Sequence, residues 1–175
     1  FYGAFFTLTY DTFKYFALGD VVIFLPYAVI PILGTTYATI SEYYYPALVL
    51  ALPIGLITVA ILHVNNTRDI ESDREAGIRT LAMLLGKRAS INLYVFEVYF
   101  PFVLVIATIC CGWLPWYSLI VLLAFPKARA NARTVRNARK QGSEALNMMD
   151  AATSQLQLMF SLLLAVSLFV GAAIN

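Results

Sequence analysis

Residues 46–64 read PALVLALPIGLITVAILHV, an apolar stretch of 19 residues without a lysine, arginine or carboxylate. A helix needs about 20 predominantly apolar residues to cross the hydrocarbon core of a bilayer. The next nine residues, 65–73, read NNTRDIESD and are almost all polar. We therefore predict a transmembrane helix over 46–64 that ends abruptly, at the membrane boundary, in a group of amide and carboxylate side chains.

The whole chain shares the apolar character of this stretch. Its 175 residues are 61% hydrophobic and 13% charged, with a mean hydropathy of +0.75. Soluble domains are about half apolar and about a quarter charged, and a small domain can bury only part of its surface. The expected solvent for this chain is therefore a lipid bilayer. Because the chain starts at Phe1 inside an apolar run, we expect it to be a fragment of a longer protein.

Four further stretches are long and apolar enough, or nearly so, to be membrane helices. They are residues 20–38, 92–111, 155–174, and a stretch that starts near 115, is apolar to 125 and is expected to continue as an amphipathic helix past 130. Prolines and glycines inside these runs predict kinked, closely packed helices. The predicted fold class is all-α: a polytopic membrane helical bundle of about five transmembrane helices, in a single membrane domain over 1–175.

The charges divide between the two ends of these helices. Because successive membrane helices reverse direction, residues 1–19, 65–91 and 127–154 are expected on one side, and the turns at 39–45 and 112–114 on the other. All 12 basic residues fall on the first side: Lys14, Arg68, Arg74, Arg79, Lys87, Arg88, Lys127, Arg129, Arg133, Arg136, Arg139 and Lys140. The positive-inside rule predicts that this side faces the cytoplasm or its topological equivalent.

The polar stretch after residue 64 has the spacing of a helix face. Asn66, Asp69 and Asp73 are spaced i, i+3, i+7, and Asn65 lies four residues before Asp69, so all four share one side of a helix expected to continue through about Glu75. Mg²⁺ prefers oxygen ligands and is often held by one or two carboxylates plus substrate phosphates. The alternative is a solvated segment whose acids pair with neighbouring arginines. Acids next to a bilayer are costly and usually functional.

A second candidate lies near the start of the chain. Lys14 is expected on the same side as the acidic stretch, with Tyr10 one helical turn away. Lys14 is suited to contact a phosphate, and Tyr10 to donate a hydroxyl hydrogen bond. The alternative is that Lys14 anchors a helix end by extending toward the membrane surface.

Residues 65–86, NNTRDIESDREAGIRTLAMLLG, closely resemble the second aspartate-rich motif of the UbiA superfamily of intramembrane prenyltransferases. Their sequence is most similar to that of the naphthoquinone branch, which includes 1,4-dihydroxy-2-naphthoate polyprenyltransferases and UBIAD-type menaquinone synthases. Tyr10-x-x-x-Lys14 matches that family's YxxxK element, and FKYFALGD at 13–20 resembles the segment after it. The resemblance implies a nine-helix fold of two similar halves, each with an aspartate-rich motif. This chain then provides the fifth to ninth helices, lacks the N-terminal half and is inactive alone.

The resemblance also implies a reaction and a set of site residues. A polyprenyl group passes from polyprenyl diphosphate to an aromatic acceptor, in this branch 1,4-dihydroxy-2-naphthoate, during menaquinone or phylloquinone synthesis. The cofactor is Mg²⁺, held by Asp69, Asp73 and Asn66, and the catalytic residues are Asp69, Asp73 and Lys14. The implied diphosphate-binding residues are Lys14, Tyr10, Asn65, Asn66, Arg68 and Arg74. No nucleic-acid partner is expected.

Two alternatives remain open. In the first, the prenyl acceptor is another aromatic compound such as 4-hydroxybenzoate. In the second, the protein is an ion-coupled membrane transporter and not a transferase. A transporter is expected to carry its acids near the middle of the membrane, on broken helices. The clustering of Asp69 and Asp73 at one boundary, among basic residues, favours phosphate chemistry.

Other polar residues have weaker assignments. Glu97 is an acid inside a predicted span, suited to bind a substrate hydroxyl or to pair with a tyrosine. His63 is expected to face the cavity, and Asp150 to cap the last span or contribute to the site. The basic run 127–140 has four arginines spaced by three or four, which predicts an amphipathic helix lying against anionic headgroups.

Overall fold

The computed structural model describes residues 23–174, so the predictions at Tyr10 and Lys14 lie outside the described residues. Within this range the chain is built from helices and turns, with no strand. The elements in chain order are η1 (Leu25–Val29), α3 (Ile30–Ile40), η2 (Tyr45–Leu50), α4 (Ala51–Arg68), α5 (Ile70–Glu75), α6 (Leu81–Cys110), η3 (Trp116–Ala124), α7 (Phe125–Gln141), η4 (Ser143–Leu146) and α8 (Met149–Ile174).

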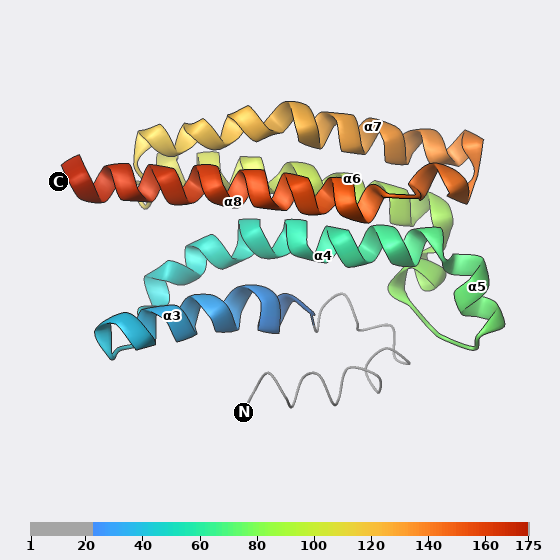
Figure 1. Cartoon of the computed structure of the whole chain (residues 1–175), viewed down its shortest axis with the longest axis horizontal. Helices are drawn as coiled ribbons and strands as arrows, with labels where there is room; N and C mark the ends of the chain where they lie inside the picture. Colours follow the sequence, from blue (N-terminus) through green and yellow to red (C-terminus); the bar gives the residue numbers. More distant parts are fainter. Residues whose placement is uncertain (1–22, 175) are drawn as a thin grey trace.

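The long helices lie side by side as rods that reverse direction at two ends (Figure 1). One end carries α5, the connection that follows it and the turn from α7 into α8. The other end carries the turn from α3 into η2, the turn from α6 into η3 and the C-terminal end of α8. The alternation of loops between two ends, predicted from the run lengths, is therefore confirmed for the described loops.

Three of the described helices are long and apolar enough to cross a membrane: Tyr45–Arg68, Leu81–Cys110 and Ser143–Ala173. A shorter apolar helix covers Leu25–Ile40. The remaining predicted span is divided into the apolar η3 and the basic α7, as the sequence pattern indicated. The all-α membrane bundle is confirmed, and each of the five predicted stretches is helical where the structure describes it.

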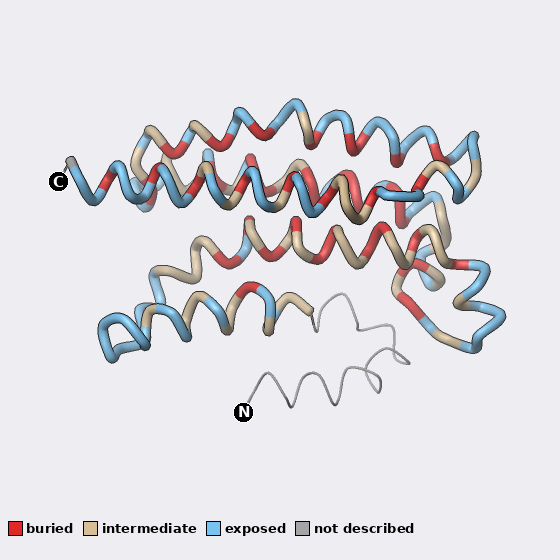
Figure 2. The backbone as a smooth tube through the Cα atoms, in the orientation of Figure 1, coloured by how far each residue is buried: buried red, intermediate tan, exposed pale blue. Residues whose placement is uncertain are grey.

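The core forms where α4, α6, α7 and α8 face one another, and Figure 2 shows their buried residues along these facing sides. Phe102 of α6 lies at its centre. Its ring meets Phe125 and Phe160 edge to face, with ring centroids 5.4 and 5.3 Å apart. Edge-to-face pairs stabilise beyond the area they bury. The buried face of α7 consists mostly of small side chains, which allow its backbone to approach α6 and α8 closely.

Two glycines account for the kinked, close packing. A Cβ at Gly55 of α4 would overlap the ring of Phe24 and the Cβ of Ala28, so the contact between α4 and η1 requires glycine there. Gly86 has φ 72° and ψ 158° and interrupts α6 five residues after its start. Glycine adopts positive φ without the steric penalty that other residues incur. The predicted close approach is therefore present at Gly55, whereas the kink at Gly86 lies outside the stretches in which kinks were predicted.

Candidate functional site

The polar stretch begins in the last turn of α4 and crosses a break in the helix. Asp69 has φ −94° and ψ 12°, so α4 ends at Arg68 and α5 begins at Ile70. The prediction of one uninterrupted helix through about Glu75 is therefore wrong at Asp69. The Ser72 hydroxyl donates to the Asp69 carbonyl at 3.0 Å, and such side-chain hydrogen bonds to the backbone compete with regular helix.

The break preserves the axial spacing of the motif. The Asp69 N–H donates to the Asn65 carbonyl at 2.9 Å, and the Asp73 N–H donates to the Asp69 carbonyl at 2.8 Å. These bonds have the four-residue spacing of an α-helix. Asn65, Asn66, Asp69 and Asp73 are all half-buried. The four predicted residues thus lie on consecutive turns at one end of the bundle, and their joint role stays a prediction.

The two arginines of the motif pair with acids. Arg68 Nε and Nη2 donate to the two carboxylate oxygens of Asp69, both at 2.7 Å, in a bidentate pair. A carboxylate has about four lone-pair sites, so Asp69 keeps acceptor capacity for a cation. Arg74 pairs with Glu71 at 2.7 Å, where both side chains are exposed. An exposed pair of this kind contributes little stability. A direct role of Arg68 or Arg74 in binding phosphate stays a prediction.

The Asn65 side chain offers an oxygen that the fold does not use. Its Oδ1 is buried and has no hydrogen-bond partner among the described residues. Buried polar atoms are nearly always satisfied, and leaving one unsatisfied is costly. An amide oxygen is also a ligand type that Mg²⁺ accepts. The Asn65 oxygen therefore fits a site that a cation or a hydrogen-bond donor of a ligand completes.

The described residues hold no cluster of three or more His, Cys, Asp or Glu side chains placed to bind a metal ion. The donors of the motif are instead two carboxylates and two amides. Such a set suits partial coordination of Mg²⁺, whose remaining ligands are commonly water and substrate phosphate. The donor set of the motif therefore fits partial coordination of a cation.

A buried hydrogen-bonded group fixes the last turn of α4 against α6. His63 Nε2 lies 2.9 Å from Ser90 Oγ and 3.1 Å from the Ser90 carbonyl. The Thr67 hydroxyl donates to the His63 carbonyl at 2.7 Å and lies 2.5 Å from Ser90 Oγ. All three residues are at most 1% exposed. His63, expected from sequence to face the cavity, instead lies in the contact between the two helices and positions the turn that carries Asn65 and Asn66.

Thr67 and Ser90 were not identified from the sequence. Thr67 lies inside the motif, four residues after His63, and that spacing was the available signal for it. Ser90 is 27 residues from His63, and only the packing of α6 on α4 brings the two together.

The chain turns back sharply after α5. The Ile78 N–H donates to the Asp73 carbonyl at 2.9 Å, and Gly77 provides the positive φ of 70° that the turn requires. The Thr80 hydroxyl then accepts from the Met83 N–H at 3.3 Å and caps α6. This turn keeps the basic residues of the α6 start at the same end of the bundle as the motif.

Two other sequence candidates lie elsewhere. Glu97 is 4% exposed in the middle of α6, and its predicted role with a substrate hydroxyl or a tyrosine stays a prediction. Asp150 lies in the first turn of α8, which begins at Met149, so it does not precede the helix as an N-cap. There it still interacts favourably with the positive end of the helix dipole.

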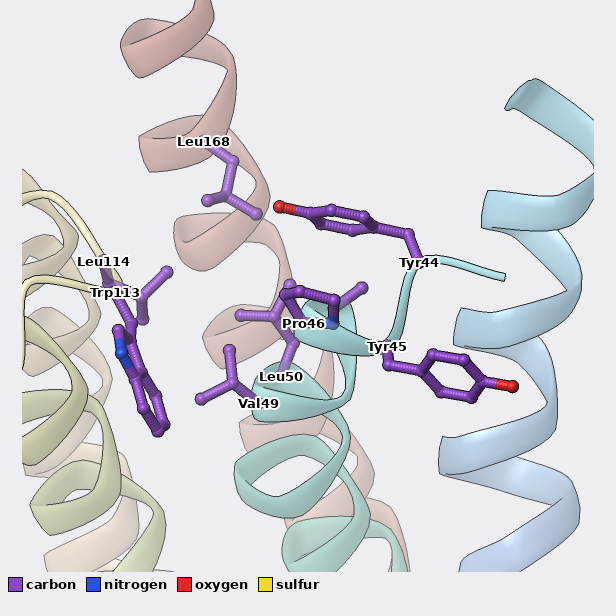
Figure 3. Close-up of a pocket in the computed structure, with 9 residues that line it drawn as sticks. Tyr44, Tyr45, Pro46, Val49, Leu50, Trp113, Leu114 and Leu168 are labelled. Carbon is purple, nitrogen blue, oxygen red and sulfur yellow. The ribbon is translucent and has the colours of Figure 1, made fainter. Parts of the chain in front are cut away.

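The pocket drawn in Figure 3 is separate from the motif. It has a volume of about 690 Å³ and lies at the start of α4, between Trp113 at the end of α6 and Leu168 of α8. Tyr44 extends toward Leu168, whereas Tyr45 points toward α3. Residues 51–64 of α4 lie between this pocket and Asn65, a helical distance of about 20 Å. The pocket does not contribute to the candidate site.

Comparison with known proteins decides the family. Residues 1–153 match the model of the UbiA prenyltransferase family, which covers most of the chain. The chain belongs to the UbiA prenyltransferase family. The resemblance found in the aspartate-rich motif is thereby confirmed. Membership of a prenyltransferase family favours the enzyme over the ion-coupled transporter.

Relatives in this family share the matched region with the chain. It is 39% identical over 153 residues to the UbiA prenyltransferase domain-containing protein 1 of Rattus norvegicus, and 38% identical over 153 residues to that of Homo sapiens. Both alignments cover 86% of this chain and 42% of the relative. The Drosophila melanogaster homolog is 34% identical over 155 residues, 89% of this chain and 41% of the relative. The chain thus spans about two fifths of these relatives' length. No solved structure matches it.

Proposed function

We propose that the intact protein of this UbiA-family chain transfers a polyprenyl group from polyprenyl diphosphate to an aromatic acceptor, with Mg²⁺ as cofactor. The observation that carries the proposal is the stretch from Asn65 to Asp73. It gathers two amides and two carboxylates in consecutive turns at one end of the bundle, and one of those amide oxygens is buried without a partner among the described residues. This chain supplies one half of the site, and the other half belongs to a part of the protein outside it.

Each residue of the motif has a part in this proposal. Asp69, Asp73 and Asn66 hold Mg²⁺, which neutralises charge on the leaving diphosphate. Asn65 offers its buried oxygen to the same ion or to a donor on the ligand. The bidentate Arg68 fixes the orientation of the Asp69 carboxylate. Preorganised groups of this kind stabilise developing charge without reorganisation during the reaction.

The basic residues bind the diphosphate in this proposal. Arg68 and Arg74 lie beside the acids, and Lys14 and Tyr10, outside the described residues, provide an ammonium group and a hydroxyl. Charge-assisted hydrogen bonds to phosphate are roughly twice as strong as neutral ones. The basic end of the bundle then faces the cytoplasm or its equivalent.

The chemical step follows from the two substrates. The allylic C–O bond of the prenyl diphosphate breaks, the electron pair leaves with the diphosphate, and a ring carbon of the acceptor attacks the allylic cation. We propose 1,4-dihydroxy-2-naphthoate as the acceptor, so that the attacked carbon loses its carboxylate as CO₂. The similarity of residues 65–86 to the naphthoquinone branch supports this acceptor over 4-hydroxybenzoate. Water must be excluded while the cation exists.

One experiment tests the reaction and the acceptor together. Membranes that contain the intact protein are incubated with labelled prenyl diphosphate and either 1,4-dihydroxy-2-naphthoate or 4-hydroxybenzoate, with Mg²⁺ or with a chelator. We expect prenylated, decarboxylated naphthoate in the presence of Mg²⁺ only. Product from 4-hydroxybenzoate alone contradicts the proposed acceptor, and product that is unaffected by the chelator contradicts the proposed cofactor.

A further inference from the structure

Helix α7 presents a basic face that the bundle does not use. Its buried face, which includes Ala128, Ala132, Val135 and Ala138, packs against α6 and α8. Its opposite face carries exposed arginines at 129, 133 and 136, spaced by four and three residues. The helix contains no acid, and none of these three arginines has an ion pair or hydrogen bond with a described residue. Like charges at this spacing repel, so the face favours an anionic partner.

The direction of α7 differs from the sequence expectation. A helix lying flat on headgroups was expected, whereas α7 runs along the bundle beside α6 and α8 (Figure 1). Its basic residues therefore form a stripe along the bundle that ends near the polar end with α5. The apolar η3 continues the same rod toward the opposite end.

A pocket of about 900 Å³ lies along this stripe, lined by the three arginines and by Tyr99, Phe125 and Pro126, among others. It is apolar at one end and cationic at the other. The rings of Tyr99 and Phe125 lie 5.6 Å apart at the η3 end, and Arg136 lies about three turns further along α7. Beyond the aromatic end, the exposed surface of η3 carries leucines, including Leu119, Leu122 and Leu123.

We propose that this pocket binds an anionic phospholipid, with its phosphate among Arg129, Arg133 and Arg136 and an acyl chain along Tyr99 and Phe125. A phospholipid carries an anionic headgroup and an apolar chain in the same order along the membrane normal. Arginine binds phosphate with two parallel hydrogen bonds, and basic pockets between membrane helices bind anionic headgroups. The single negative charge of the lipid phosphodiester offsets part of the repulsion among the three adjacent arginines.

This pocket is distinct from the proposed diphosphate site. The motif lies on α4 and α5, and α6 and α8 each contact both α4 and α7. The three arginines point away from the buried face of α7, so they lie on the outside of this part of the bundle. The proposal therefore does not depend on the prenyltransferase activity.

The test uses the intact protein in a neutral detergent and native mass spectrometry. The protein is titrated with phosphatidylglycerol and, separately, with phosphatidylcholine of the same chains. We expect a preference for phosphatidylglycerol that falls at least about tenfold in the variant Arg129→Gln/Arg133→Gln/Arg136→Gln. The matched control, Arg79→Gln/Arg88→Gln/Lys140→Gln, removes the same charge from exposed positions at the same end and keeps the preference.

Two further measurements separate a lipid site from a phosphate site. Ala130→Trp fills the pocket and keeps all three arginines, and we expect it to weaken phosphatidylglycerol binding. An excess of sn-glycerol 3-phosphate is expected not to displace the lipid, because it lacks the acyl chains. The proposal is overturned if the intact wild-type protein shows no preference, if the control loses the preference equally, or if glycerol phosphate displaces the lipid. It is also overturned if the arginine variant raises the KM for prenyl diphosphate while lipid binding is unchanged.

Discussion

The two ends of α4 have surroundings of different chemistry. At its C-terminal end, α4 passes into the motif, over the buried group of His63, Thr67 and Ser90. At its N-terminal end, it is preceded by Tyr43, Tyr44 and Tyr45, and Trp113 and Trp116 lie at the same end of the bundle. The turns at that end contain one charged residue, Glu42.

The aromatic end exposes large rings on its surface. Trp113, Trp116 and Tyr45 are 69%, 74% and 65% exposed, and the Tyr37 and Tyr43 rings stack at 4.8 Å. Tryptophan and tyrosine gather at membrane interfaces, where an apolar ring and a polar tip are both satisfied. The residues below the motif are instead fully buried and hydrogen-bonded to one another. One end therefore exposes aromatic rings suited to a membrane interface, and the other holds polar groups in fixed positions.

The largest expected effect is the loss of the carboxylates. In the intact protein, Asp69→Ala and Asp73→Ala are each expected to lower prenyl transfer by about 100-fold or more, because the metal contributes several kcal/mol to stabilising the leaving diphosphate. Transfer is measured with labelled prenyl diphosphate. Glu71→Gln is the control, since Glu71 is an exposed acid of the same segment that pairs with Arg74. Retained transfer in both alanine variants refutes their metal role.

A smaller effect is expected for Lys14. In the intact protein, Lys14→Ala is expected to raise the KM for prenyl diphosphate by roughly tenfold, since a charge-assisted hydrogen bond contributes about 1.5–3 kcal/mol. Steady-state kinetics at saturating acceptor measure it. If KM and kcat are both unchanged, Lys14 is only an anchor at the membrane surface.

The buried group under the motif links stability to function. His63→Leu removes the imidazole that bonds Ser90 and is expected to destabilise the intact protein by about 1–3 kcal/mol, while Thr67 keeps its bonds to the residue 63 carbonyl and to Ser90 Oγ. Thermal unfolding in detergent measures this loss. We also expect transfer at a temperature where the variant is folded to fall, because the turn carrying Asn65 and Asn66 is no longer fixed. Normal transfer by the folded variant shows that the group has a structural role only.

The smallest effect is expected from a buried pair of serines at the aromatic end, the counterpart of the buried group under the motif. Ser118 Oγ and Ser167 Oγ lie 3.0 Å apart, both at most 2% exposed, and join η3 to α8. Ser167→Ala is expected to lower stability by about 1 kcal/mol and to leave transfer by the folded protein unchanged. If it reduces transfer as much as His63→Leu does, the two ends do not differ in function.

The sequence predicted the features that depend on local spacing. Run lengths predicted the helices and their alternation. The common face of Asn65, Asp69 and Asp73, predicted from their intervals, stays a prediction, because the helix is interrupted at Asp69. The break at Asp69 was missed because helical periodicity does not report where a single residue leaves helical backbone angles.

Long-range contacts were also missed. Tyr94 and Thr153, whose hydroxyls lie 2.7 Å apart, are separated by 59 residues, and Ser118 and Ser167 by 49. Such pairs depend on which helix faces meet. The basic, amphipathic nature of α7 was correctly predicted, but its path along the bundle depends on the small residues that pack against α6 and α8.

The central claim is that the polar end of α4 forms half of a site that binds diphosphate through Mg²⁺. Calorimetric binding of a prenyl diphosphate to the intact protein tests it most directly, with and without Mg²⁺, for wild type and for Asp69→Ala/Asp73→Ala. We predict that removing Mg²⁺ weakens wild-type binding by at least about tenfold, and that the variant binds weakly and responds little to the ion. Equal affinity with and without Mg²⁺ in the wild type, or an undiminished Mg²⁺ response in the variant, contradicts the claim.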